Sequence, residues 1–141
     1  MAGYSGTPLL QKLGITPESK VCLVDAPRGV VDAPIAARAP FDVIVCFVTT
    51  RAQLVKHIAA QRPRLAQDGG LWIAWPKKAS GVTTDVTENT IREVCLPTGL
   101  VDNKVCAIDA TWSGLRLVIR RELRTGPAKP PRRASARSTG R

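Results

Sequence analysis

The chain of 141 residues is poor in aromatic side chains and in histidine. Aromatic residues make up 4% of the sequence, and His57 is its single histidine. The sequence contains no Ser/His/Asp arrangement, no phosphate-loop motif and no Gly-x-Gly-x-x-Gly fingerprint, which argues against triad hydrolases, P-loop nucleotidases and dinucleotide-dependent enzymes. No apolar run approaches the ~20 residues that a membrane-spanning helix needs. The first residues also lack the basic and apolar regions of a secretory signal, so we expect a cytoplasmic protein without a membrane partner.

The four cysteines form no metal-binding pattern. They are Cys22, Cys46, Cys95 and Cys106, each inside an apolar segment and outside any Cys-x-x-Cys pair. Zinc sites need closely spaced ligands with suitable partners, and His57 is far from every cysteine in the sequence. We therefore expect buried, reduced thiols that pack as small hydrophobic side chains, and no metal site.

The segment over residues 41–75 predicts a strand–helix–strand unit around which the rest of the chain is organised. Residues 41–48 are apolar almost without interruption. Such a run is typical of a strand that is covered on both faces in a parallel sheet. Thr50 and Gln53 then form a capping-box pattern, in which each side chain satisfies a free backbone N–H group at the start of a helix.

The same helix is expected to be long and to carry an apolar face. Leu54, Ile58 and Leu65 recur at helical spacing. Pro63 should kink or split the helix, because proline offers no backbone N–H group. We expect residues 68–70, Asp-Gly-Gly, to end the helix and a second buried strand to begin directly after them.

The remaining segments complete an α/β pattern. Apolar runs predict strands over residues 20–25, 104–109 and 115–121, and the last two are joined too closely for a parallel crossover, so they should form an antiparallel hairpin. Helices are expected over residues 8–14 and from an N-cap at Asp85. The pattern predicts a three-layer α/β sheet of about five strands, mostly parallel, with one antiparallel strand near the C-terminus.

The formal net charge of +10 is unevenly distributed. Residues 1–124 hold 16 of the 21 bases and all 11 acids, whereas residues 125–141 hold five bases and no acid. The second stretch otherwise contains only Gly, Pro, Ala, Ser and Thr, which cannot build a core. We expect one domain over residues 1–124 and a disordered basic tail over residues 125–141. Such a tail can contact nucleic-acid phosphates weakly and in a salt-dependent way, or it can simply keep the chain soluble.

Three segments, residues 2–9, 75–81 and 112–118, resemble an uncharacterised bacterial family catalogued as domain of unknown function 3052. That resemblance covers residues 1–124 and brings no activity with it. The order of the predicted elements also resembles a shortened S-adenosylmethionine-dependent methyltransferase. This second resemblance implies a Rossmann-like, methyltransferase-type sheet, in which a terminal hairpin inserts one antiparallel strand and two strands beyond the first are missing.

The turn after the first strand departs from the methyltransferase pattern. Such enzymes carry an acid-x-Gly-x-Gly turn there, whereas residues 25–29 of this chain are Asp-Ala-Pro-Arg-Gly. Pro27 removes an N–H group and fixes φ where a glycine should stand. A divergent enzyme would, by the same resemblance, hold the cofactor with Asp25, Gly29 and Asp109.

Cations and hydroxyl groups follow two of the predicted strands. The residues are Lys77, Lys78, Ser80, Thr49 and Thr50. Ligands of open parallel sheets bind at the carboxyl ends of the strands, and helix starts with free N–H groups favour anions. These residues therefore form a candidate site for an anion such as phosphate or carboxylate. The alternative is that Asp85 caps the helix and that both lysines are simply solvated.

The degenerate cofactor turn favours a non-catalytic binding or regulatory module that uses no cofactor. Its partner would be an anionic small molecule or a protein. Two alternatives stay open: a divergent methyltransferase that uses S-adenosylmethionine, and a nucleic-acid-associated protein that uses its basic tail. His57, on the flank of the helix, is expected to be half-exposed and not catalytic.

Overall fold

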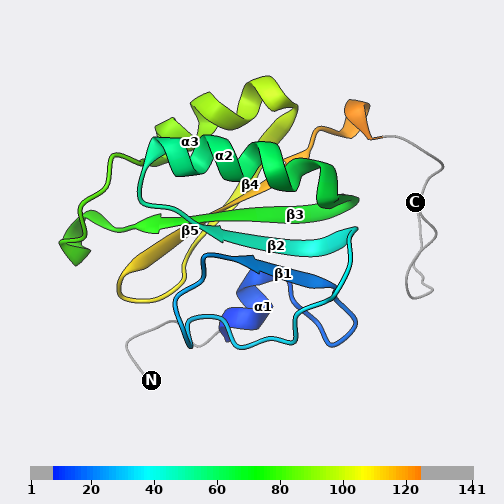
Figure 1. Cartoon of the computed structure of the whole chain (residues 1–141), viewed down its shortest axis with the longest axis horizontal. Coiled ribbons are helices and arrows are strands. Elements are labelled where there is room, and N and C mark those ends of the chain that lie inside the picture. The colour runs from blue at the N-terminus through cyan, green and yellow to red at the C-terminus, as the bar shows by residue number, and fades with distance from the viewer. Residues whose placement is uncertain (1–7, 125–141) are drawn as a thin grey trace.

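A computed structural model describes residues 8–124, and Figure 1 shows them as a mixed sheet with helices on both of its faces. The strands are β1 (Val21–Val24), β2 (Phe41–Phe47), β3 (Leu65–Pro76), β4 (Leu100–Ala107) and β5 (Trp112–Ile119). Their order across the five-stranded sheet is β1-β2-β3-β5-β4. Strands β1, β2 and β3 are parallel, and β5 is antiparallel to both β3 and β4. The predicted basic tail lies outside the described residues.

Three helices and four short 3-10 turns connect the strands. The helices are α1 (Leu9–Leu13), α2 (Arg51–Gln61) and α3 (Glu88–Cys95), and the turns are η1 (Arg62–Arg64), η2 (Lys78–Ser80), η3 (Leu96–Thr98) and η4 (Arg121–Leu123). In Figure 1, α2 and α3 cover one face of the sheet, and α1 with the irregular segment over residues 25–40 covers the other. Among the described residues, no helix is long and apolar enough to cross a membrane.

Strand β2 is covered on both faces, as its nearly continuous apolar run predicts. Ile44 and Cys46 pack into the core beneath α2 and α3. Val45 and Phe47 point to the opposite core, which contains Leu13 of α1. Each of these side chains is at most 3% exposed. Because successive side chains of a strand alternate between its faces, an alternating pattern would instead mean one wet face.

The capping box at the start of α2 is confirmed. The hydroxyl of Thr50 accepts a hydrogen bond from the backbone N of Gln53 over 3.1 Å, and the side-chain oxygen of Gln53 accepts one from the backbone N of Thr50 over 3.3 Å. The two contacts satisfy two of the N–H groups that the first helical turn leaves free.

The predicted end of α2 was wrong. The helix ends at Gln61, directly before the turn that contains Pro63, and β3 already begins at Leu65. Residues 68–70 lie inside β3 and do not stop a helix. Gly69 is needed there because a Cβ atom would lie only 2.8 Å from the backbone oxygen of Asp42. The glycine therefore marks a close approach between neighbouring strands, while proline ends the helix.

The predicted N-cap of α3 was also wrong. Thr87 caps this helix, and its hydroxyl accepts a hydrogen bond from the backbone N of Thr90 over 3.2 Å. Asp85 lies two residues before the cap, and its carboxylate binds the start of a different helix, α2.

The last two strands form an antiparallel pair, but each begins earlier in the chain than its apolar run suggests.

Candidate functional site

The residues proposed from the sequence lie at the carboxyl ends of β1, β2, β3 and β4. Because β4 is antiparallel to β5, which is itself antiparallel to β3, all four of these strands point the same way. Asp25 follows β1, Thr49 follows β2, Lys77 follows β3 and Asp109 follows β4. In Figure 1 this edge of the sheet lies on the left, where the arrowheads of β1, β2 and β3 end. Ligands of open α/β sheets bind at this edge.

Asp25 and His57 form a pair at the end of β1. Oδ2 of Asp25 lies 2.8 Å from Nε2 of His57, which comes from α2. The Asp25 side chain is 61% exposed, whereas that of His57 is 10% exposed. Asp25 has a φ of +56°, in the left-handed region that non-glycine residues rarely adopt. Backbone of this kind is common at functional sites, where surrounding contacts hold it in place.

The burial of His57 overturns the expectation of a half-exposed side chain. Its spacing from Leu54 and Ile58 could have predicted this burial. The three residues stand at positions i, i+3 and i+4, which share one face of a helix, and Leu54 and Ile58 are both buried. A buried polar ring needs a hydrogen-bond partner, which Asp25 supplies. The histidine thus orients the exposed carboxylate from the interior side.

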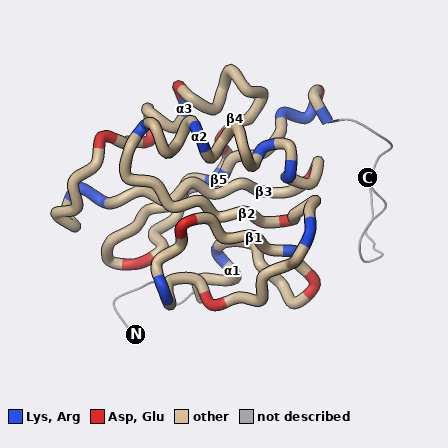
Figure 2. The backbone as a smooth tube through the Cα atoms, viewed as in Figure 1, with Lys and Arg blue, Asp and Glu red and all other residues tan. Residues whose placement is uncertain are grey.

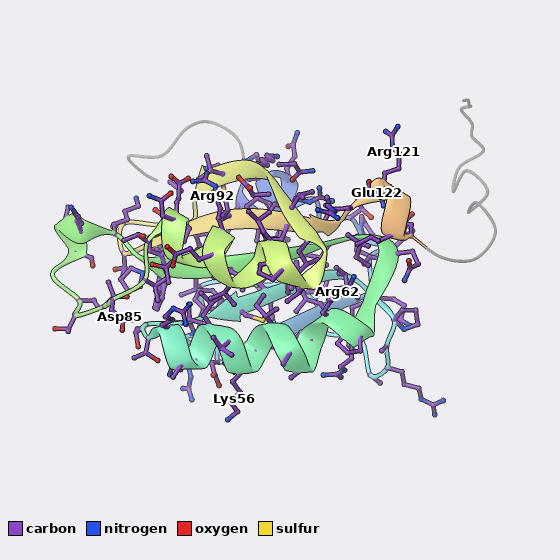
Figure 3. The ribbon with its side chains drawn as sticks, turned by 90° about the horizontal axis from the view of Figure 1, so that it is seen from above. Lys56, Arg62, Asp85, Arg92, Arg121 and Glu122 are labelled. Carbon is purple, nitrogen blue, oxygen red and sulfur yellow. The ribbon has the colours of Figure 1, made fainter. Side chains whose placement is uncertain are left out.

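Side chains of the protein itself accept the hydrogen bonds of the free backbone N–H groups at the start of α2. Oε1 of Gln53 accepts hydrogen bonds from the backbone N of Thr49 over 2.8 Å and from its hydroxyl over 3.2 Å. Oδ1 of Asp85 accepts one from the backbone N of Arg51, the first residue of the helix, over 2.8 Å. Figure 3 shows Asp85 beside this end of the helix. A carboxylate of the chain therefore sits where an external anion would bind at a helix N-terminus.

Lys77, Lys78 and Ser80 lie on the projecting loop that follows β3 (Figure 1). The hydroxyl of Ser80 donates to the backbone oxygen of Lys77 over 2.7 Å and accepts from the backbone N of Val82 over 3.1 Å, so it holds the loop together. Lys77 is half-buried and Lys78 is exposed. Within residues 8–124 the two ammonium groups have no ion-pair partner, which leaves them available to an anion.

Asp109 stabilises the turn between β4 and β5. Its Oδ1 accepts hydrogen bonds from the backbone N atoms of Thr111 and Trp112, each over 2.8 Å. The indole of Trp112 packs edge-on against Phe47, with ring centroids 5.1 Å apart. Gly29, the third residue of the cofactor hypothesis, has a φ of +79°, and a Cβ atom added to it would meet no other atom within 4 Å. Asp25 and Asp109 thus each have one carboxylate oxygen bound by the chain itself.

The expected burial of the thiols is confirmed for two of the four cysteines. Cys46 and Cys95 are fully buried, and Cys22 and Cys106 are partly buried. Burial raises the pKa of all four thiols, that of Cys95 to about 12. Among the described residues no group of histidine, cysteine and acidic side chains could hold a metal ion. A thiol whose pKa is raised in this way is a poor nucleophile at neutral pH.

A cavity of about 720 Å³ lies at the opposite, amino edge of the sheet, and the sequence did not predict it. Its charged lining consists of Glu18, Asp42, Asp68 and Arg116. Burial lowers the pKa of the Arg116 guanidinium, and the nearby Arg124 lowers it further. Three carboxylates and one guanidinium give the lining a formal net charge of −2, so this cavity does not favour an anion.

The comparisons with known proteins identify a fold. No family model and no curated protein matches the chain. Among solved structures, the fibrillarin pre-rRNA processing protein of Methanococcus jannaschii is similar with a TM-score of 0.51 and 15% identity, over 84% of this chain and 72% of that one. At this identity the likeness shows a shared fold and nothing more.

Two further structures match less well. The ribosomal protein L11 methylase of Lactobacillus delbrueckii subsp. bulgaricus has a TM-score of 0.48 and 13% identity, over 74% of this chain and 59% of that one. Fibrillarin of Aeropyrum pernix, with natively bound S-adenosyl-L-methionine, has a TM-score of 0.43 and 19% identity, over 58% of this chain and 38% of that one. The chain thus spans about three fifths of the L11 methylase. The resemblance to domain of unknown function 3052 is not supported by a family model and stays a prediction.

Proposed function

We propose that the chain is a cytoplasmic, non-catalytic binding domain built on a shortened methyltransferase-type, Rossmann-like sheet. One observation carries this proposal: the carboxylates at the ends of β1 and β4 are engaged by the chain. Asp25 is bound by His57, and Asp109 is bound by two backbone N–H groups of its own turn. Residues 25–40, where a complete methyltransferase would continue to its ribose-binding strand, form no helix or strand. These features support a domain that works without S-adenosylmethionine.

The ligand we propose for the carboxyl edge is a small anion held by Lys77 and Lys78. The hydroxyls of Thr49 and Ser80 already bind within the chain, and Thr50 caps α2, so these three residues would shape the site and the two lysines would supply the charge. A compact, strongly hydrated ammonium group binds phosphate or carboxylate as a point charge and needs no fixed geometry. An exposed loop of this kind favours a ligand that is bound reversibly.

A thermal-shift screen of the full chain with phosphate, nucleoside phosphates and dicarboxylates tests this site. The double variant Lys77→Ala, Lys78→Ala should lose the stabilisation that the best anion gives to the natural chain. The control is the double variant Arg38→Ala, Lys56→Ala, which removes the same charge from exposed positions away from the carboxyl edge. If the anion shifted the melting temperatures of both double variants equally, it would act through net charge, and the proposal of a site at Lys77 and Lys78 would be wrong.

The second candidate is a divergent methyltransferase. It is favoured by the shared fold and by the exposed carboxylate of Asp25, which follows the first strand, where the resemblance implies that the cofactor binds. In that case His57 would position Asp25 for the cofactor. Binding of S-adenosylmethionine separates the two candidates, because the first predicts none.

A further inference from the structure

Arg116 in β5 is a half-buried cation. Within residues 8–124 its guanidinium makes no hydrogen bond and no ion pair. Burial lowers the pKa of this guanidinium, but arginine nevertheless stays protonated in folded proteins. Burying a charge without a partner costs free energy. An anion beside Arg116 would therefore stabilise the charged side chain.

The guanidinium of Arg116 lies across the neighbouring strand β3 at Gly70. A Cβ atom on Gly70 would lie 2.9 Å from Cζ and 2.9 Å from a terminal nitrogen of Arg116. Any larger residue at position 70 would thus push the guanidinium aside. Because the side chain already rests on the backbone of the sheet, it loses less conformational freedom when it binds a ligand.

Two lysines lie beside Arg116. Lys104 stands directly opposite Arg116 in the antiparallel pair of β4 and β5, a position in which like charges destabilise a sheet. Nζ of Lys104 donates to the backbone oxygen of Lys12 over 3.0 Å, and Nζ of Lys12 donates to that of Ala107 over 3.2 Å. An ammonium group has three N–H donors, so each lysine keeps others for a ligand. Figure 2, in which Lys and Arg are blue, shows a basic position on α1, on the face of the sheet opposite α2 and α3.

These three cations line a hollow of about 240 Å³, which we call the Arg116 hollow. Asn103, Leu13 and Gly14 complete its lining, and no acidic side chain of the described part of the chain belongs to it. Leu13, Gly14 and Arg116 also line the cavity of about 720 Å³, so the two spaces share the guanidinium. The formal net charge of −2 on the larger cavity disfavours a second anionic group there.

We propose that the Arg116 hollow binds a small molecule through one anionic group, a carboxylate or a phosphate, and that the neutral or cationic remainder of this molecule extends into the larger cavity. The planar fork of Arg116 matches two anionic oxygens at once, and Lys12 and Lys104 add point charges. The Arg116 hollow uses neither Lys77 nor Lys78, so each of the two sites can exist without the other.

The indole signals in proton–nitrogen NMR spectra of the full chain report on the two sites separately. Nε1 of Trp72 donates to the backbone oxygen of Leu13 over 3.0 Å, and Leu13 lines the Arg116 hollow. Trp112 instead follows Thr111, whose backbone oxygen accepts a hydrogen bond from the backbone N of Lys77 over 2.8 Å. Signals are assigned with tryptophan-to-phenylalanine variants. A ligand in the hollow should therefore shift the Trp72 signal more than the Trp112 signal.

The probes are butyrate, γ-aminobutyrate, succinate and glycerol phosphate. Both γ-aminobutyrate and glycerol phosphate should shift the Trp72 signal until it saturates, and their relative affinities identify the preferred anionic group. Succinate should bind more weakly than γ-aminobutyrate, because its second carboxylate would meet the negatively charged lining of the larger cavity. Butyrate should fall between the two.

Arg116→Gln should weaken binding of the better probe about tenfold or more, because hydrogen bonds to charged groups are the strong ones. Arg116→Lys keeps the charge without the fork and should bind with intermediate affinity. The control is Lys56→Gln, which removes one charge from an exposed position on α2 and should bind as the natural chain does. Lys104→Gln, also at an exposed position, should weaken binding and keeps the test valid if Arg116→Gln does not fold.

Three results would overturn the proposal. The first is a Trp72 signal that no probe shifts at millimolar concentration. The second is an equal loss of affinity in Arg116→Gln and Lys56→Gln, which would show that the probe responds only to net charge. The third is tighter binding of succinate than of γ-aminobutyrate, which would contradict the assigned role of the larger cavity.

Discussion

Replacing Asp85 with alanine tests whether the chain itself fills the anion position at the start of α2. Oδ1 of Asp85 lies 2.8 Å from the backbone N of Arg51, so the substitution removes a charged acceptor from the first turn of the helix. Losing a side-chain cap destabilises a protein by about 1 kcal/mol, and losing an anionic group near a helix N-terminus destabilises it by a similar amount. For a chain of 141 residues this corresponds to a melting temperature roughly 3–5 °C lower.

The same substitution should make the protein more responsive to anions. Once the N–H group of Arg51 is free, sulfate can bind there, and it should raise the melting temperature of Asp85→Ala more than that of the natural chain. Glu93→Ala is the control, because it removes the same charge from an exposed position on α3. Asp85→Asn keeps a hydrogen-bond acceptor without the charge, so sulfate should raise its melting temperature by an amount between those for Asp85→Ala and the natural chain.

The measurement is a thermal melt of each variant in sulfate and in chloride at equal ionic strength. Chloride matching is needed because sulfate stabilises folded proteins in general. The reasoning is refuted if Asp85→Ala melts like Glu93→Ala, or if sulfate raises the melting temperature of all variants by the same amount.

Three further outcomes follow from single contacts. Gly99→Ala should lower the melting temperature more than Gly81→Ala in thermal melts, because both glycines have positive φ but only at Gly99 would the new methyl group collide with a leucine side chain; equal losses would contradict this. His57→Leu should speed amide hydrogen exchange around Asp25, which loses its partner, and unchanged exchange would speak against the pair. Burial raises the pKa of the Cys46 thiol, so at pH 8 maleimide should label it far more slowly in the folded protein than in urea, as peptide mass spectrometry can measure.

The sequence predicts those parts of the fold that depend on local chemistry. The apolar run over residues 41–48 indicates a doubly covered strand, and Thr50 with Gln53 indicates the start of α2. The end of α2 was misplaced because two helix-ending signals compete, Pro63 and the glycines at 69 and 70. Proline ends the helix through its own missing N–H group. The glycines are instead required by the close approach of a neighbouring strand, which the local sequence does not reveal.

The candidate site depends on contacts between distant segments, and these could not be predicted. Asp25 and His57 are 32 residues apart, and each alone has an ordinary structural explanation. Asp85 caps a helix that begins 34 residues earlier, although its position before α3 suggested a local cap. Only the folded sheet brings such pairs together, so the sequence could name the residues of the edge but not their partners.

Isothermal titration of the full chain with S-adenosylmethionine tests the central claim most directly. If the carboxylates at the ends of β1 and β4 serve the chain itself, no binding heat should appear even at millimolar ligand. Saturable binding at micromolar concentrations that disappears in Asp25→Ala would contradict the account and would establish a cofactor site at the end of β1.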